Sequence, residues 1–100
     1  MLKHVILWTL KPELTEEEKN TVRRNTKEQL EALLGKIDGL VSIQVHIQGL
    51  ATSNTDMMLD SVFTDQDALA RYASHPLHVD AANNYLRPYY IERRCFDFEE

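Results

Sequence analysis

The sequence predicts a single α+β domain, in which one antiparallel sheet carries helices on one of its faces. Three observations predict this class. A central segment alternates apolar and polar residues, as half-buried strands do, and two other segments repeat apolar residues at helical spacing. The chain has 100 residues, the length of one domain, which we place at residues 1–100.

The first expected element is a strand from His4 to Leu10. Both of its alternating faces are mostly apolar, so we expect both to be buried. Pro12 closes the strand, because proline cannot donate a hydrogen bond to a neighbouring strand.

A helix should follow, because Thr15 and Glu18 form a capping box. Either Gly35 or Gly39 can supply the positive φ that ends this helix. Its buried face is expected to hold Val22, Thr26, Leu30, Leu33, Leu34 and Ile37.

Two further strands are expected after this helix, from Leu40 to Gln48 and from Met57 to Phe63. A polar segment separates them and predicts a surface loop over residues 49–56. Alternation places four apolar residues of the first of these strands on one face: Val41, Ile43, Val45 and Ile47.

The second helical region is expected to be interrupted at His75. The residue before a proline is disfavoured in the α conformation, and Pro76 suits the first position of a new helix. This region begins at a cap on Thr64 or Asp65 and runs to about Tyr90. A last strand over residues 91–98 places Phe96 and Phe98 on one face.

The resulting order, β-α-β-β-α-β, is that of a ferredoxin-like sheet with helices on one face. The first and third strands are apolar on both sides, so the side without helices needs a cover. A second copy of the chain is the simplest cover, which predicts a homodimer with its sheets packed face to face, forming a dimeric α/β barrel.

Composition excludes several classes of function. The net charge is −5 and there is no block of basic residues, which disfavours nucleic acid as a partner. No apolar run is long enough to span a membrane. With three glycines there is no phosphate-binding loop, so no nucleotide cofactor is expected. The single cysteine favours a reducing compartment, and we expect a cytoplasmic location.

Three side chains around the helix break can carry chemistry: Tyr72, His75 and His78. His75 lies at the expected helix cap, and His78 lies near the third position, where the helix N-terminus and burial should lower its pKa. A neutral His78 could accept a proton, and Tyr72 could donate to an oxyanion. The alternative is structural: a histidine that only caps a helix and a tyrosine that only fills the core.

Other polar residues give weaker signals. His4 and His46 lie on separate strands, and the spacing of the histidines matches no metal-binding motif, so no metal site is expected. Cys95 lies in the middle of a strand and is expected to be buried and inert. Arg93 and Arg94 point to opposite faces of their strand, so they cannot form a clamp for an anion.

Residues 3–8 (KHVILW), 72–79 (YASHPLHV) and 96–98 (FDF) resemble the stress-responsive A/B barrel domain family. The resemblance runs over almost the whole chain, and the His-Pro-x-His element is its most specific part. It implies a dimeric ferredoxin-like α+β barrel. A plant branch of this family includes olivetolic acid cyclase, which closes a linear polyketide by aldol chemistry without metal or cofactor. That resemblance places an acid/base pair on Tyr72 and His78 and a supporting histidine on His4.

The leading hypothesis is a homodimer with an apolar pocket for a small apolar, phenolic or keto ligand. If the protein is an enzyme, it is a cofactor-independent cyclase, lyase or isomerase, with His78 as the base, Tyr72 as its partner and His4 as an orienting group. Two alternatives remain open. One is a noncatalytic, stress-related dimeric protein, and the other is a cofactor-free monooxygenase of a related dimeric barrel type.

Overall fold

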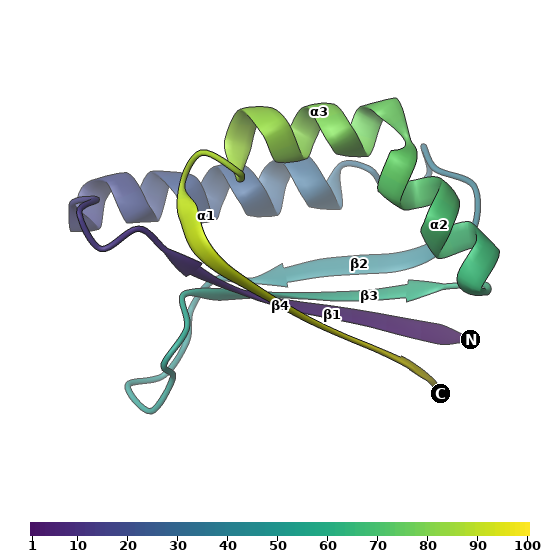
Figure 1. Cartoon of the computed structure of the whole chain (residues 1–100), viewed down its shortest axis with the longest axis horizontal. Helices are drawn as coiled ribbons and strands as arrows, with labels where there is room; N and C mark the ends of the chain where they lie inside the picture. Colours follow the sequence, from purple (N-terminus) through teal and green to yellow (C-terminus); the bar gives the residue numbers. More distant parts are fainter.

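The computed structural model describes residues 1–100 and confirms the ferredoxin-like arrangement. Four strands form one antiparallel sheet in the order β2-β3-β1-β4, and all three helices lie on one face of it (Figure 1). The elements are β1 (Leu2–Leu10), α1 (Glu16–Glu31), β2 (Leu40–His46), β3 (Met57–Phe63), α2 (Gln66–Ser74), α3 (Pro76–Tyr85) and β4 (Tyr90–Glu99).

The start of α1 is the predicted capping box. The Thr15 hydroxyl accepts from the Glu18 N–H at 3.1 Å, and the Glu18 carboxylate accepts from the Thr15 N–H at 2.8 Å. The helix ends earlier than expected, at Glu31, and a series of turns follows it. Both glycines have positive φ, 86° at Gly35 and 87° at Gly39, and they shape these turns rather than ending the helix.

The turns change which apolar residues are buried after α1. Leu33 and Ile37 are buried as expected, but they reach the core from the turns. Leu34 was expected on the buried face and is exposed instead. The helical spacing no longer applies after Glu31, because the chain has left the helix there.

The prediction for the face of β2 is wrong at Val41, which is exposed. The pairing between β2 and β3 shifts between Leu40 and Ser42, so the strand carries one extra residue at this point. This bulge moves Leu40 to the buried face together with Ile43 and Val45, and Val41 turns to solvent.

Only one face of the central strands is fully buried. Alternate residues of β1 and β3 face the helices and are buried, while the residues between them are half-buried on the outer face. Since β4 is an edge strand, almost all of it is exposed. Within a single chain, the expected burial of both faces of β1 is therefore confirmed only for the face that lies against the helices.

The break between α2 and α3 lies where the sequence predicts it. His75 has extended backbone, with φ −66° and ψ 132°, and Pro76 opens α3. The Leu77 N–H donates to Nδ1 of His75 at 3.1 Å, so this histidine caps the helix through its ring. No helix combines the length and the apolar character that crossing a bilayer requires.

Candidate functional site

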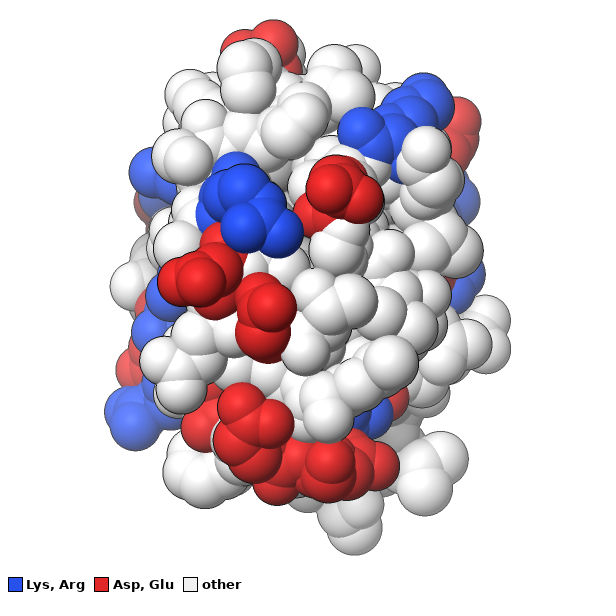
Figure 2. Space-filling model, turned by 90° about the vertical axis from the view of Figure 1, so that its right-hand side faces the viewer, with Lys and Arg blue, Asp and Glu red and all other residues white.

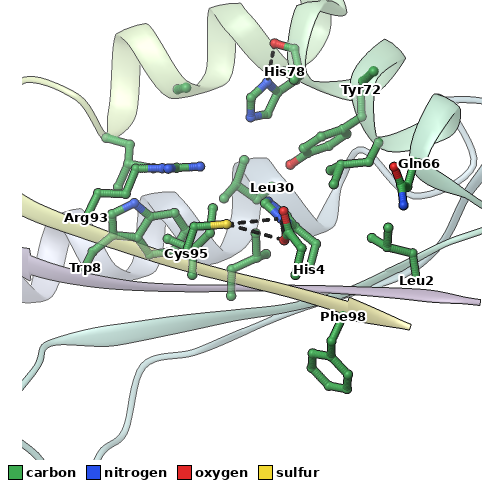
Figure 3. A pocket seen from close by; sticks show the side chains of 18 of the residues that line it. Leu2, His4, Trp8, Leu30, Gln66, Tyr72, His78, Arg93, Cys95 and Phe98 are labelled. Carbon is green, nitrogen blue, oxygen red and sulfur yellow. Dashed lines mark hydrogen bonds and ion pairs between the residues drawn. The ribbon is translucent and has the colours of Figure 1, made fainter. Parts of the chain in front are cut away.

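A cavity of about 900 Å³ lies between the helix layer and the β1–β4 side of the sheet (Figure 3). Most of the side chains that line it are hydrophobic. Its size suits a small organic molecule, since ligand pockets usually measure ~300–1,000 Å³. The sheet contributes His4 and Trp8 from β1 and Cys95 from β4, and the helices contribute Tyr72 and His78.

The space exists because the helices present small side chains toward it. Ala70 and Ala73 of α2 and Ala82 of α3 are among its lining residues. The helix α3 packs against α1 and α2 rather than closely on a strand, so little covers β4. A larger side chain at these alanines would fill volume that is open here.

Tyr72 and His78 come together across the break between α2 and α3. Their ring centroids are 4.2 Å apart, with the ring planes inclined by 38°. Tyr72 also packs edge-on against Phe63 of β3, at 4.9 Å between centroids. The structure therefore brings together the two residues that the resemblance assigned to an acid/base pair.

The proton on the His78 ring is located by its hydrogen bond. Nδ1 lies 3.3 Å from the Ala73 carbonyl oxygen, and because a carbonyl oxygen only accepts, Nδ1 carries the proton. In the neutral ring Nε2 then has a free lone pair, and Figure 3 shows this second nitrogen pointing into the cavity.

Burial is the main cause that lowers the pKa of His78. The Ala73 carbonyl opposes this effect, while the positive charges of Arg87 and Arg93 add to it. The direction agrees with the expectation from sequence, and of the two expected causes, the helix N-terminus and burial, it is burial that dominates. A histidine of this kind is largely neutral at pH 7 and can accept a proton.

Tyr72 carries a polar group that the folded chain leaves without a partner. Its side chain is 2% exposed, and its hydroxyl makes no hydrogen bond. Burial raises the pKa of Tyr72, so the phenol keeps its proton and remains a donor. Buried polar groups normally find partners, so an unpartnered donor beside a cavity is a feature that a ligand could satisfy.

His4 lies on the sheet side of the same cavity and is buried. Its Nδ1 lies 2.5 Å from the Asp97 carboxylate of β4, and it forms no hydrogen bond with Tyr72 or His78. The third residue of the expected site thus lies in the cavity, held by a carboxylate that the sequence did not single out.

The expectation that Cys95 is buried is wrong, because β4 is an edge strand and leaves this residue exposed. Partial burial of its sulfur, followed by the hydrogen bond to Asp97, raises the pKa of the thiol. Arg93 lines the cavity, whereas Arg94 pairs with Glu92 at 2.9 Å. His46 is exposed on β2 and lies outside the cavity lining.

Charged side chains are scattered at the end of the molecule that carries α2 and the two termini. Figure 2 shows acidic side chains gathered toward the lower edge of this face and basic side chains in separate groups. Broad uncharged areas lie between them.

Comparison with known proteins gives a family model and several solved structures. The model of the stress-responsive A/B barrel domain matches residues 2–100. A dimeric protein of unknown function with a ferredoxin-like fold from Bacteroides fragilis is 33% identical, with a TM-score of 0.93, and the match covers 99% of this chain and 95% of that one. No curated protein matches the chain.

Two more distant structures share the fold alone. A Dabb family protein from Mesorhizobium loti is 20% identical, with a TM-score of 0.76 over 99% of this chain and 95% of that one. A protein from Nitrosomonas europaea, provisionally described as an antibiotic biosynthesis monooxygenase, is 10% identical, with a TM-score of 0.78 over 100% and 98%. Because the family model spans nearly the whole sequence, the chain belongs to the stress-responsive A/B barrel domain family.

Proposed function

We propose that the protein is a cytoplasmic homodimer that binds a small apolar ketone or phenol in the cavity of each chain and removes a proton next to a carbonyl group. The observation that carries this proposal is the free Nε2 of a half-buried His78 beside the unpartnered hydroxyl of Tyr72, both facing a largely apolar cavity. An acceptor and a donor thus converge on one space without being bonded to each other.

The chemistry follows from these two groups. Nε2 of His78 takes the proton from the carbon next to the carbonyl, the electron pair of that C–H bond forms the C=C bond of an enolate, and the π electron pair of the carbonyl moves onto its oxygen. The Tyr72 hydroxyl donates a hydrogen bond to the resulting oxyanion. The enolate then attacks a second carbonyl, as in aldol cyclisation, and the protonated His78 gives its proton to the alkoxide that forms. In isomerisation the protonated His78 instead gives its proton to another carbon of the conjugated enolate. His4 of the cavity wall would orient the ligand.

The homodimer is supported by the outer face of the sheet. Phe96 and Phe98 are 70% and 38% exposed there, and their ring centroids lie 5.8 Å apart. Val5 and Leu7 of β1 share this face and are half-buried. The Bacteroides fragilis relative, itself dimeric, supports the same assembly.

Sedimentation tests the dimer. At micromolar concentration we expect twice the 11.6 kDa of one chain. Phe96→Asp should give monomers, because a charge in a packed apolar interface is strongly disfavoured. Leu50→Asp, at an even more exposed apolar residue outside the sheet, should leave the dimer intact. A monomeric parent protein would contradict the proposal.

Ligand binding is tested by thermal shift with a panel of small ketones and phenols. A compound present at ~100 times its dissociation constant should stabilise the fold by about 2.7 kcal/mol. Ala82→Leu should remove this shift, since it places a larger side chain in the cavity. If no compound stabilises the protein, or if Ala82→Leu responds like the parent, the cavity is not a ligand site and the noncatalytic alternative is favoured.

Proton abstraction is tested by NMR, without knowledge of the natural product. Ketones that bind are incubated in D₂O, and loss of their α-proton signals is followed. His78→Gln should abolish the catalysed exchange, and Tyr72→Phe should slow it ~10²- to 10³-fold. The matched control is Arg24→Gln, at an exposed residue of α1 that does not line the cavity, which should exchange at the parent rate. Binding without exchange would reduce the proposal to a binding protein.

A further inference from the structure

Three side chains that bind metals elsewhere meet on the sheet side of the cavity. Nδ1 of His4, Sγ of Cys95 and a carboxylate oxygen of Asp97 all lie within 4.8 Å of one another. In Figure 3 dashed lines join the Cys95 sulfur to its two partners, the His4 ring and the Asp97 carboxylate. None of the three was singled out from the sequence as part of a metal site.

The register of the sheet brings the three together. His4 of β1 is directly opposite Asp97 of β4, and Cys95 precedes Asp97 by two residues, so all three side chains project from the same face. The cluster therefore depends on the pairing of two strands rather than on a single flexible side chain.

We propose that His4, Cys95 and Asp97 bind a divalent transition metal of the zinc type, at a site that opens into the cavity. Nitrogen, thiolate and carboxylate are all ligands that Zn²⁺ accepts, and three protein ligands leave the fourth tetrahedral position open. Thiolate together with imidazole also disfavours Mg²⁺ and Ca²⁺, which prefer oxygen ligands.

The distances between the ligand atoms are close to those of a tetrahedral site. The sulfur lies 3.7 Å from Nδ1 of His4 and 3.3 Å from Oδ1 of Asp97. Bond lengths of about 2.3 Å to sulfur and about 2.0 Å to nitrogen and oxygen require ligand separations of roughly 3.3–3.6 Å. Only the 2.5 Å between Nδ1 and Oδ1 must widen, and Asp97 is exposed enough to rotate away.

Charge also fits the site. The thiolate of Cys95 and the carboxylate of Asp97 together neutralise a divalent cation. Arg93 projects from the same face of β4 two residues before Cys95, so a dication beside it depends on both anionic ligands. His4, Cys95 and Asp97 line the same cavity into which Nε2 of His78 points. This metal site goes beyond the function proposed above and does not depend on it.

The test uses untagged protein under a non-thiol reductant, with Co²⁺ as a spectroscopic probe for the zinc-type site. We expect one Co²⁺ per chain, visible d–d absorption of a tetrahedral centre, and a thiolate-to-cobalt charge-transfer band. Because Cys95 is the only cysteine, that band reports on this residue alone. Zn²⁺ should displace the Co²⁺ and abolish both absorptions.

Variants distinguish a built site from adventitious binding. Cys95→Ser should abolish the charge-transfer band, and Asp97→Asn should weaken Co²⁺ binding at least tenfold. The controls are His46→Gln and Asp80→Asn, at an exposed histidine and an exposed acid that do not line the cavity, and both should bind Co²⁺ like the parent. His4→Gln extends the test if it folds, but Asp97→Asn is sufficient because Asp97 is exposed.

Three results would overturn the proposal: no charge-transfer band, one metal bridging the thiolates of two chains, or unchanged affinity in Asp97→Asn. The metal site and the base are tested separately, because α-proton exchange can be measured in the presence of a chelator. Loss of α-proton exchange in His78→Gln with intact Co²⁺ binding would separate the two sites. Loss of Co²⁺ binding in Asp97→Asn with intact α-proton exchange would separate them equally well.

Discussion

The helix layer covers the two halves of the sheet differently. Over β2, helix α1 packs directly on the strand, whereas α3 is supported by α1 and α2 (Figure 1). A cavity lies between α3 and the strands β1 and β4. The packed half supplies stability, and that stability allows the other half to keep empty space and unpartnered polar groups. The candidate site is therefore a region where packing is incomplete.

Polar contacts differ between the halves in the same way. In the packed half the Glu31 carboxylate accepts from the Val45 N–H at 2.8 Å and from Lys27 at 2.7 Å, which ties α1 to β2. Arg23 donates to Asp56 at 2.9 Å. In the open half the Tyr72 hydroxyl has no partner at all. The Thr26 hydroxyl of α1 in the packed half is also unpartnered, but Thr26 does not line the cavity, so of these two hydroxyls a ligand could reach only that of Tyr72.

The largest expected effect comes from a pair of matched truncations. Leu33 and Leu86 are each 5% exposed, but only Leu86 lines the cavity. Leu33→Ala should lower the free energy of unfolding by about 3–5 kcal/mol, as truncation of a packed core leucine does. Leu86→Ala should cost about 1–2 kcal/mol less, because this side chain already lacks packing atoms on one side.

Denaturant unfolding of both variants checks this prediction. Equal losses of unfolding free energy would mean that the space beneath α3 is closed in solution. A larger loss for Leu86→Ala would reverse the assignment of the packed and open halves.

A smaller effect is expected from Tyr72→Phe, which should leave the fold as stable as the parent or raise the unfolding free energy by about 1 kcal/mol. The variant removes a buried hydroxyl that has no hydrogen-bond partner, and such groups cost free energy. Thr26→Val is the matched control, since the Thr26 hydroxyl of α1 is also buried and unpartnered. Both variants should be stable, but only Tyr72→Phe should impair ligand binding.

Calorimetric ligand titration of the two variants, alongside their unfolding curves, separates stability from binding. Marked destabilisation by Tyr72→Phe would mean that the hydroxyl has a structural partner in solution, which would remove it from the proposed site.

The smallest effect concerns pH. Because burial lowers the pKa of His78, the unfolded chain binds more protons than the folded chain below about pH 6.5. The stability associated with the neutral ring is therefore lost as the pH falls from 6.5 toward the folded-state pKa. His78→Gln should show a shallower loss of stability in this window, measured as melting temperature against pH.

Leu77→Gln, at an exposed neighbour on α3 that does not titrate, should keep the slope of the parent. If melting temperature depends on pH equally in the parent and in His78→Gln, the His78 imidazole has the same pKa in the folded and the unfolded chain, which would contradict the prediction.

Local chemistry made part of this structure predictable. The break at His75 and Pro76 follows from the backbone restrictions around proline, and it places Tyr72 and His78 within one turn on either side. The capping box at Thr15 is equally local. Such features depend only on residues that are close in the sequence, so they can be predicted without knowledge of the tertiary structure.

Features that depend on strand pairing were not predictable in this way. The bulge near Val41 depends on the register between β2 and β3, and the exposure of Cys95 depends on β4 being at the edge of the sheet. The contact of His4 with Asp97 joins residues 93 positions apart. Cys95 and Asp97 are two residues apart, so the sequence alone places them on one face of β4. That His4 shares this face follows only once the pairing of β1 with β4 is known.

The central claim is that an unprotonated Nε2 of His78 faces the cavity, and nitrogen-15 NMR of the histidine rings tests it most directly. With the resonances assigned by His78→Gln, the account predicts a neutral ring at pH 7, with the proton on Nδ1 and a pKa below the ordinary value of about 6.5. A ring that is charged at pH 7, or that carries its proton on Nε2, would contradict the account.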